Sequence, residues 1–433
     1  MPPLSAAACV WVGYSGGCDS HVLLHLLAQL RQAQPFELKA VYVNHGLSPK
    51  AAEWGEHSRA ICDDLDVSFV SLEVDATPKE GESPEAAARH TRYAAITELL
   101  HPGDYFCTAH HQDDQAETLL LQLLRGAGPK GLAGMPASSS LGKATQLRPL
   151  LGFSQTQLRD YANQHTLNWI EDESNTDTGF NRNYLRHEVM PILRTRWPSA
   201  DTTIARSAAN CAEAAQLLEV LAEQDYQSVK SESSTELSGG KLLELDFARQ
   251  KNLLRYWIHQ AGLPLPSEIK LQHVISDVLH AAQDKMPCVK WPGAEVRRFD
   301  GRLYVMPPLP EFDTTQVIPW DNLEQPLLLP DGRELVLKPT NQQSALSTKQ
   351  LRQGRVSVRF RQGGEQLHPV GSQRHKSLKQ IFQEYRVPPW KRGRTPLLYV
   401  GDTLAAVVGG CLSQTINTSG DELGVIPEFI ESI

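Results

Sequence analysis

The chain has 433 residues, which is too long for one ordinary core and indicates about two to four domains. Hydrophobic residues make up 41% of it and charged residues 21%, and no apolar run is long enough to span a membrane, so the composition excludes membrane and disordered proteins. The net charge of −8 argues against indiscriminate binding of polyanions. Because the N-terminus lacks the basic start of a signal peptide, we expect a cytoplasmic protein with no membrane partner.

The first 170 residues alternate β-branched or aromatic runs with amphipathic helical patterns, which is typical of βαβ units around a parallel sheet. Two helix starts are marked by Ser83 before Pro84 and by a capping box of Ser154 and Gln157. The expected strands cover residues 9–14, 38–43, 68–74, 105–109 and 146–150. We therefore predict a doubly wound α/β domain over residues 1–200, whose ligands bind at the carboxyl ends of its strands.

The pattern changes after residue 200, where apolar residues recur at helical spacing and strand signals fade. We predict a helical domain over 201–310, with helices at 247–258 and 268–279. A Pro-rich stretch then suggests a linker over 311–349. The last part, residues 350–433, restarts with VSVRF, holds one helical pattern at 378–385, and is expected to be a small α+β domain.

A Gly-rich turn, Ser15-Gly-Gly-Cys-Asp-Ser20, stands between the first expected strand and a helical run. Backbone N–H groups freed by small residues, together with the positive end of the next helix, form a site for phosphate oxygens. A plain βα turn also uses glycine pairs, and neither GxxxxGK[ST] nor GxGxxG occurs in the chain. SGGxDS in this place resembles the PP-loop of ATP pyrophosphatases, a Rossmann-like fold whose members cut ATP between its α and β phosphates.

That resemblance implies that the loop holds pyrophosphate through Ser15, Gly16, Gly17, Cys18, Asp19 and Ser20. It also places Asp19 close to the phosphates and to Mg²⁺, and puts the adenosine near the end of the second strand, where His45 stands. A histidine that merely caps the strand end is the alternative for His45.

An acidic cluster, His110-His-Gln-Asp-Asp-Gln-Ala-Glu-Thr118, follows the fourth expected strand. Asp113 and Asp114 lie four and three residues before Glu117, so the carboxylates share one side of a first helical turn. Such carboxylates can hold Mg²⁺ or accept a proton from an amine. The helix dipole alone also favours acids in a first turn, so the spacing by itself leaves both interpretations open.

HHQDDQAET followed by RGAGPKGLAGM closely resembles the second signature of the tRNA(Ile)-lysidine synthetases. The blocks EAAARHTRY, RPLL and WIEDESN through FNRNYLRH fit the same family. The resemblance implies that Asp114 is a catalytic and metal-binding acid and that Lys130 contacts tRNA. Arg182 and Arg186, four residues apart, are expected to act on an α-phosphate or an RNA phosphate, although a solvated basic face would have the same spacing. Which of the two arginines acts on the α-phosphate stays open.

The family's reaction converts the wobble cytidine of tRNA(Ile) with a CAU anticodon into lysidine. ATP first adenylates the C2 oxygen and releases pyrophosphate, and the ε-amino group of free L-lysine then displaces AMP. This order is physically reasonable, because a carbonyl oxygen on an aromatic base leaves poorly until it is joined to a phosphate. Members of the family are frequently dimers, so a homodimer is possible.

The C-terminal region is strongly basic, with twelve Lys and Arg against two Asp and Glu between residues 349 and 394. A local balance of +10 in an acidic chain, with aromatic residues interleaved, suits phosphates and exposed bases. The resemblance implies that this domain holds tRNA outside the anticodon. The residues expected to bind tRNA there are Arg361, Arg374, Lys376, Lys379, Trp390, Lys391 and Arg392.

Three other functions are alternatives, and a glutamine-dependent ligase is the weakest of them because the sequence shows no amidotransferase domain. A tRNA sulfur-transferase would need paired cysteines or an iron–sulfur cluster, but the seven cysteines show no CxxC or metal spacing, and only Cys18 and Cys107 are near the site. We expect reduced thiols and no zinc. An RNA-binding protein with a decayed ATP site is the third alternative, and the presence of Asp19, Asp114 and Arg182 argues against it.

Overall fold

A computed structural model describes residues 9–46, 50–75, 77, 84–172, 176–231, 233–282, 285–340, 344–418 and 424–430. The predicted cap Ser83, and residues 173–175 of the WIEDESN block, lie outside these ranges. The chain divides into two compact units, Met1–Leu221 and Ala222–Ile433. Within the described residues, no helix is both long and apolar enough to cross a membrane.

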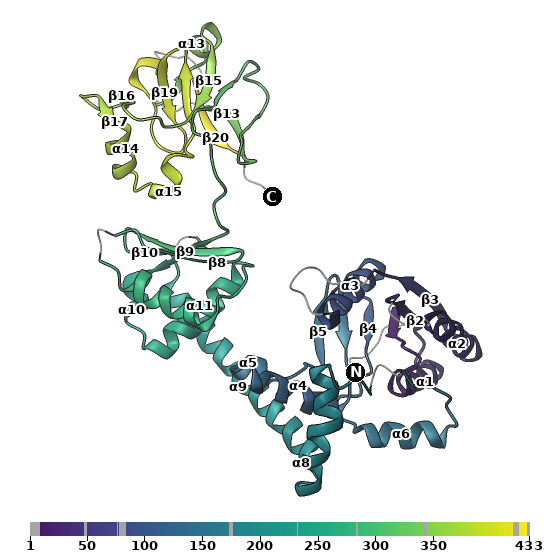
Figure 1. Ribbon diagram of the computed structural model, residues 1–433. Coiled ribbons are helices and arrows are strands. Elements are labelled where there is room, and N and C mark those ends of the chain that lie inside the picture. Colours follow the sequence, from purple (N-terminus) through teal and green to yellow (C-terminus); the bar gives the residue numbers. More distant parts are fainter. Residues whose placement is uncertain are drawn as a thin grey trace. The chain divides into compact units, whose positions relative to one another are not determined.

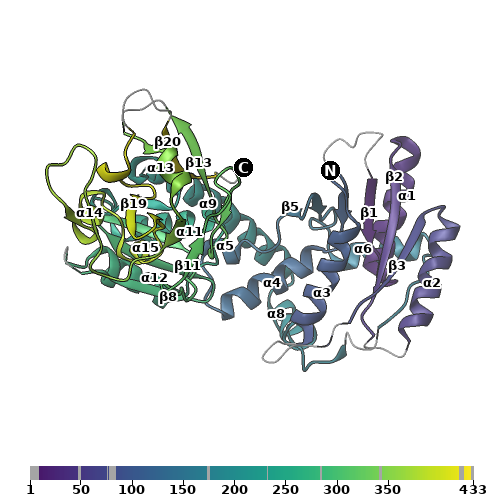
Figure 2. The same ribbon diagram turned by 90° about the horizontal axis from the view of Figure 1, so that it is seen from above.

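The first unit is built on a six-stranded sheet with the order β3-β2-β1-β4-β6-β5 (Figures 1 and 2). Five strands run parallel, and only β5 pairs antiparallel, with β6. The strands are β1 Cys9–Gly13, β2 Glu37–Asn44, β3 Ser68–Glu73, β4 Tyr105–Cys107, β5 Ser138–Leu141 and β6 Ala144–Leu147. The predicted parallel sheet is therefore confirmed, with an added antiparallel edge strand.

Helices cover both faces of this sheet, because successive side chains of a buried strand point to opposite sides. Val10 and Val12 of β1 pack into a core with α1 and α6, whereas Trp11 packs on the other face with Ile96 of α3. The helices are α1 Cys18–Ala33, α2 Ala51–Asp64, α3 Pro84–Leu99, α4 Gln112–Leu124, α5 Pro129–Leu132 and α6 Gln155–Gln164. The predicted capping box of Ser154 and Gln157 starts α6, and the doubly wound fold class is confirmed.

A helical run leads out of the sheet domain and contains both expected arginines. It comprises α7 Asn181–Tyr184, a π-helical turn η2 Leu185–Val189, α8 Met190–Arg196 and the long helix α9 Ala200–Val229. Single π turns inside helices are often found at functional sites. Leu185 and Met190 of this run are buried, whereas Arg182 and Arg186 are only partly buried.

The second unit starts with a helical layer against an antiparallel sheet, not with helices alone. The predicted helices at 247–258 and 268–279 are present in α11 Phe247–Gln260, α12 Glu268–His273 and η3 Val274–Leu279, preceded by α10 Gly239–Leu243. The sheet has the order β7-β10-β9-β8, from Glu236–Ser238, Arg302–Met306, Ala294–Phe299 and Cys288–Trp291. The predicted helical region is present, and the sheet within 201–310 is a first correction to it, because its short strands bury their apolar faces against α11 and η3.

The C-terminal part has two four-stranded antiparallel sheets and short helices. One sheet runs β11-β15-β18-β19 and the other β12-β13-β20-β14. The strands are β11 Val317–Pro319, β15 Val356–Arg359, β18 Leu397–Val400, β19 Thr403–Val407, β12 Leu327–Leu328, β13 Glu334–Thr340, β20 Gly424–Phe429 and β14 Leu346–Ser347. Smaller elements are β16 Gln366–Leu367, β17 Lys376–Ser377, α13 Thr348–Gln353, α14 Leu378–Glu384, α15 Pro389–Arg392 and the 3-10 turn η4 Gln414–Ile416.

The linker expected over 311–349 is a second correction. Strand β13 pairs along its whole length with β20 near the chain end, and β11 pairs with β15. The prediction took the prolines as evidence against strands. Pro319, however, lies on β11 at the edge of its sheet, where its missing N–H removes no hydrogen bond between strands. The C-terminal domain therefore begins well before residue 350.

Candidate active site

The Gly-rich turn after β1 has the geometry of a phosphate loop. Gly16 has φ of +80°, and a side chain there would meet Ile170 Cδ1 at 3.0 Å and Ser58 Oγ at 3.2 Å. Ser20 Oγ donates to Gly17 O (2.9 Å) and lies 3.1 Å from Ser15 Oγ, so the hydroxyls hold the turn closed. Helix α1 begins at Cys18 behind it, which directs free backbone N–H groups toward an anion.

His111, the N-cap residue of α4, joins this loop to the acidic cluster. Its ring is 2% exposed, and Nε2 lies 3.6 Å from Asp19 Oδ2 and 3.5 Å from Asp114 Oδ2, with Asp113 Oδ1 3.7 Å from Nδ1. Burial lowers the pKa of His111, but the contacts with Asp113 and Asp19 and the charge of Asp114 outweigh it and raise the pKa to about 10. A buried imidazolium therefore holds the three carboxylates together.

Asp114 and Glu117 of α4 bind both expected arginines. Arg182 donates from Nε to Glu117 Oε2 (2.8 Å) and from Nη2 to Asp114 Oδ1 (3.1 Å). Arg186 donates from Nε to Glu117 Oε1 (2.7 Å) and from Nη2 to Asp114 Oδ1 (3.0 Å). The acids are 7% and 2% exposed, so the four charges form a compact, largely desolvated cluster.

The cluster fixes the ionisation of its members. Burial alone would raise the pKa of Asp114, but the charges of His111 and Arg182 lower it below its usual value. Burial likewise opposes the charge of Arg186, yet its pKa is raised by the hydrogen bond and charge of Glu117. Asp114 is thus a carboxylate whose two oxygens already accept hydrogen bonds, from His111 N (3.0 Å) and from the two guanidinium groups.

A third arginine ties the far end of the same helical run to α4. Arg194 donates to Asp113 Oδ2 (2.9 Å) and to Asp201 Oδ2 (2.7 Å), which joins α8 and α9 to the first turn of α4. Asp113 Oδ1 also accepts from the backbone N–H of Gln155 (3.0 Å) at the start of α6. Asp113 therefore connects the start of α4 to α6 and α8, and so positions the helices that carry the site.

His45, at the end of β2, accepts a hydrogen bond at Nε2 from Arg92 Nε of α3 (3.1 Å). Because a guanidinium only donates, the imidazole must be neutral, with its proton on Nδ1. Burial and the charge of Arg92 lower the pKa of His45 to about 4. Its Nδ1 is buried and has no hydrogen-bond partner within the described part of the chain. His45 therefore presents one fixed donor at the strand end.

Comparison with known proteins decides the family. A PP-loop domain model matches residues 3–193, a TilS substrate binding domain model residues 237–304, and a TilS substrate C-terminal domain model residues 356–428. A tRNA(Ile)-lysidine synthase of Coxiella burnetii is 44% identical over 413 residues, which cover 95% of this chain and 91% of that one. The chain belongs to the tRNA(Ile)-lysidine synthase family.

Further relatives agree. Lysidine synthases of Pectobacterium atrosepticum and Methylococcus capsulatus are 41% and 40% identical, each covering 92% of this chain and 90% of their own. Among solved structures, a U34-tRNA thiolase of Methanococcus maripaludis covers 48% of this chain and 74% of its own, at 20% identity and a TM-score of 0.42. A crystal structure of a TilS C-terminal domain covers 26% of this chain and 96% of its own, at 19% identity and a TM-score of 0.22.

Asp19 and Asp114, the two acids expected to bind Mg²⁺, differ in whether they have an oxygen available for the ion. Asp19 Oδ1 is buried and accepts no hydrogen bond from the described residues, so it keeps a free oxygen of the kind that Mg²⁺ prefers. Both oxygens of Asp114 are occupied. No group of three or more His, Cys, Asp or Glu side chains with metal-ligating geometry occurs in the described ranges. Asp19 together with phosphate oxygens therefore fits Mg²⁺, and Asp114, in this arrangement, does not.

The structure brings together the loop, Asp19, Asp114, Arg182 and Arg186, but not every expected residue. Lys130 lies exposed on α5 of the same unit, and no interaction of its side chain with the cluster is found in the described residues. Glu117 and His111 were counted in the predicted acidic cluster but given no role of their own, and Arg194 and Arg92 were not predicted to act. The HHQDDQAET motif could have indicated the first two, whereas Arg194 finds Asp113 only through the tertiary fold.

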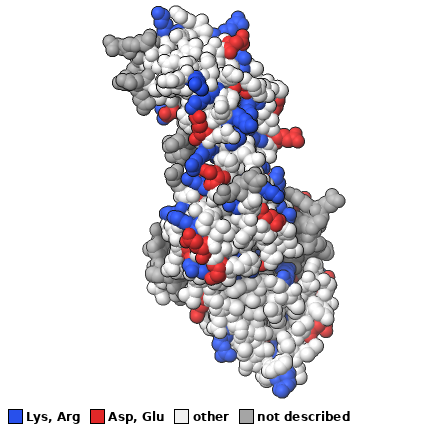
Figure 3. Space-filling model, turned by 90° about the vertical axis from the view of Figure 1, so that its left-hand side faces the viewer, with Lys and Arg blue, Asp and Glu red and all other residues white. Residues whose placement is uncertain are grey.

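The remaining expected tRNA-binding residues belong to the second unit, where Lys and Arg side chains are interspersed with acids on the surface (Figure 3). Lys376 is paired with Glu384 (2.8 Å). Trp390 packs its ring against Phe299 and Tyr304, with centroids 6.2 and 5.3 Å away. No ion pair is found for the other five within the described chain: Arg361, Arg374, Lys379, Lys391 and Arg392.

Proposed function

We propose that this protein makes lysidine at the wobble cytidine of a CAU-anticodon tRNA(Ile), using ATP and free L-lysine. The observation that carries the proposal is the meeting of the phosphate loop and the acid–arginine cluster, with His111 lying 3.6 Å from Asp19 and 3.5 Å from Asp114. One sheet edge thus offers a phosphate cradle beside cations that can stabilise charge on a reacting phosphate. The names of the relatives support the same activity.

The reaction has two steps. The C2 oxygen of cytidine forms a bond to the α-phosphorus of ATP, the bond between the α and β phosphates breaks, and pyrophosphate leaves. The ε-nitrogen of lysine then bonds to C2, the C2–O bond breaks, AMP leaves with that oxygen, and the amine loses a proton. Both steps develop charge on phosphate oxygens, which fixed donors stabilise better than water does.

The residues divide this work between them. The loop from Ser15 to Ser20 binds the pyrophosphate portion, and the adenosine lies near His45 at the end of β2. Mg²⁺, held by Asp19 and phosphate oxygens, supplies charge neutralisation when bound. Arg182 and Arg186 both donate to Asp114 Oδ1. If either guanidinium turned to the α-phosphate, that oxygen of Asp114 would accept one hydrogen bond fewer. Asp114 then orients the lysine amine and accepts its proton.

The proposed function also implies how tRNA is attracted and where the enzyme works. The free cations of the C-terminal domain and Lys130 attract tRNA phosphates. The enzyme works in the cytoplasm, where free lysine and ATP are abundant, and a homodimer is compatible with the family resemblance.

Sulfur transfer is disfavoured by the state of the nearby thiols. Burial and the charge of Asp19 raise the pKa of Cys18 to about 11, and burial raises the pKa of Cys107 to about 12. Only a thiolate is an effective sulfur nucleophile, and both thiols stay protonated at neutral pH. None of the seven cysteines is paired in a disulfide.

The test measures pyrophosphate release and incorporation of radiolabelled lysine with purified tRNA. Pyrophosphate release should require tRNA, and label should enter tRNA only when lysine and ATP are both present. Asp114→Ala should abolish incorporation, and Asp160→Ala on the exposed face of α6 is the matched control. Near-normal incorporation by Asp114→Ala would contradict its assigned role, and pyrophosphate release without tRNA would contradict the proposed function.

A further inference from the structure

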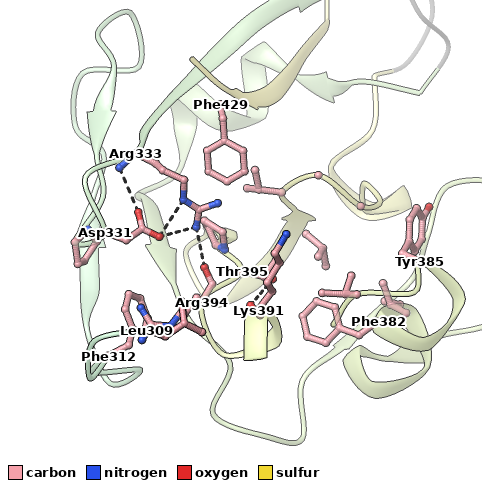
Figure 4. A pocket seen from close by; sticks show the side chains of 18 of the residues that line it. Leu309, Phe312, Asp331, Arg333, Phe382, Tyr385, Lys391, Arg394, Thr395 and Phe429 are labelled. Atoms are coloured by element: carbon pink, nitrogen blue, oxygen red, sulfur yellow. Dashed lines mark hydrogen bonds and ion pairs between the residues drawn. The ribbon is translucent and has the colours of Figure 1, made fainter. Parts of the chain in front are cut away.

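A pocket of about 630 Å³ opens in the C-terminal domain, far along the chain from the phosphate loop. Its walls come from the 309–312 and 330–333 segments, from α14 and α15, and from the turn after β19. Figure 4 shows Arg333 and Asp331 on one side, Tyr385 on the other, and Lys391 pointing into the space between them. This volume lies in the range of small-molecule sites. Such sites are lined mainly by apolar side chains, with a few polar groups that orient the ligand.

Most of the charged and aromatic groups of this pocket are already engaged. Arg333 binds Asp331 Oδ2 through Nε (2.9 Å) and Nη2 (2.7 Å), and its guanidinium lies 4.2 Å from the centroid of the Phe429 ring. Arg394 donates to Pro310 O and lies 4.8 Å from the Phe312 ring centroid. These pairs form rigid walls and leave little for a ligand to gain from them.

Three side chains, Glu311, Tyr385 and Lys391, have no partner among the described residues. Tyr385 is 49% exposed, and in the described residues no other ring or cation lies against its face. Lys391 is exposed, and no hydrogen bond or ion pair of its Nζ is found in those residues. The backbone under Lys391 is fixed, because its N–H donates to Pro388 O (2.9 Å) and its carbonyl accepts from Thr395 Oγ1 (3.0 Å). A flat apolar face and an unpaired ammonium therefore point into one pre-formed space.

We propose that this pocket binds a single unpaired nucleotide of the RNA substrate, with its base stacked on Tyr385 and its phosphate on Lys391. The inference rests on the proposed function for the presence of RNA, and adds where an unpaired nucleotide is held. Stacking on an aromatic side chain accepts any base, and a lysine contacts phosphate as a point charge, so the site selects single strands but not a sequence.

The charges favour a nucleotide over a peptide. Three cations and two acids line the pocket, and Arg333 neutralises Asp331, so the rim is positive despite Glu311. The surrounding stretch 349–394 carries a balance of +10. A duplex cannot present one base to a pocket of this size, whereas an unpaired nucleotide can be splayed out into it.

The experiment uses the full chain and two RNA probes, the tRNA substrate and the same tRNA without its unpaired 3′-terminal nucleotides. Tyr385→Leu should weaken binding of the intact tRNA about tenfold, and Tyr385→Trp should retain it. Lys391→Gln should reduce the slope of log affinity against log salt by about 0.7, the value for one single-strand phosphate contact, and Lys391→Arg should restore it. Lys338→Gln on β13, outside the pocket, is the matched control.

Removal of the unpaired nucleotides should erase the difference between wild type and Tyr385→Leu if they are the bound ones. If the difference persists on the shortened tRNA but disappears with a plain RNA duplex, another unpaired nucleotide occupies the pocket and the proposal stands. Equal weakening of duplex and tRNA, or unchanged affinity of both variants, would overturn it. Lysidine formation by the wild type and by Lys338→Gln is measured in parallel, so that failure of the pocket is distinguishable from failure of the proposed function.

Discussion

Arginines are used in opposite ways in the two regions that carry the chemistry and the basic charge. At the sheet edge of the first unit, Arg182, Arg186 and Arg194 are each bonded to a carboxylate that is at most 13% exposed. In the basic stretch of the second unit, Arg352, Arg359 and Arg386 pair only with carboxylates that are at least 42% exposed, and Arg361, Arg374 and Arg392 have no ion pair within the described chain. Buried charges must be paired to be tolerated, whereas exposed cations are free to exchange counterions for a polyanion.

This difference indicates that the charges of the first region hold the active-site side chains in place, whereas those of the second region attract tRNA. Variants of the first should change stability or rate and be almost insensitive to salt. Variants of the second should change tRNA affinity and its salt dependence while leaving the rate at saturating tRNA alone.

The largest expected effect comes from breaking the buried cluster. Glu117→Ala leaves two guanidinium groups without their main partner, and should destabilise the first unit by about 3–5 kcal/mol. Urea unfolding followed by tryptophan fluorescence, with wild type and variant compared, measures this loss. Glu213→Ala, at an exposed position of α9, should cost little, and a similar cost for both variants would contradict the assigned role of Glu117.

Removing one arginine at a time should lower the rate next most strongly. Arg182→Ala or Arg186→Ala should reduce single-turnover pyrophosphate release about 100- to 1000-fold, since each removes a donor to the charged phosphate. The variant with the greater loss identifies the arginine that acts on the α-phosphate. The dissociation constant for tRNA should stay within about twofold of wild type. A parallel loss of tRNA affinity would mean that the buried arginines serve attraction after all.

A titration of His45 should have an intermediate effect. Its pKa is lowered to about 4 by burial and by Arg92, so as the pH falls below about 6.5 the unfolded chain takes up a proton before the folded one does. The stability that neutral His45 contributes is complete above pH 6.5 and is lost as the pH falls toward 4, by at most about 3 kcal/mol. Thermal melting of wild type and His45→Gln between pH 7 and pH 4 measures the difference. Parallel curves for the two proteins would refute the neutral, buried histidine.

The smallest effects should arise in the basic stretch. Arg374→Gln or Lys379→Gln, at exposed positions, should weaken tRNA binding by roughly fivefold at 0.1 M salt and lower the salt slope by about 0.7–0.9. Filter binding across a salt series measures both quantities. The rate of lysidine formation at saturating tRNA should not change, and a large rate defect would erase the contrast between the two regions.

Local signals carried the prediction of the sheet domain. The strand, glycine turn and helix around Gly16 were readable because each depends on neighbouring residues, and the capping box at Ser154 forms within four residues. Hairpin strand β5 escaped because SSSL has little apolar alternation. The C-terminal linker was predicted wrongly because β13 is stabilised by β20, which lies far ahead in the chain.

By itself the sequence determined which chemical groups this protein has and where along the chain they stand, and its motifs determined the family. Only the tertiary structure decided their state. Arg182 and Glu117 are 65 residues apart and Arg186 and Asp114 are 72 apart, so no local pattern specifies that they bind each other. Whether a charge is buried and paired, or exposed and free, depends on distant residues that remove water or supply a partner, and this sets its pKa and its function.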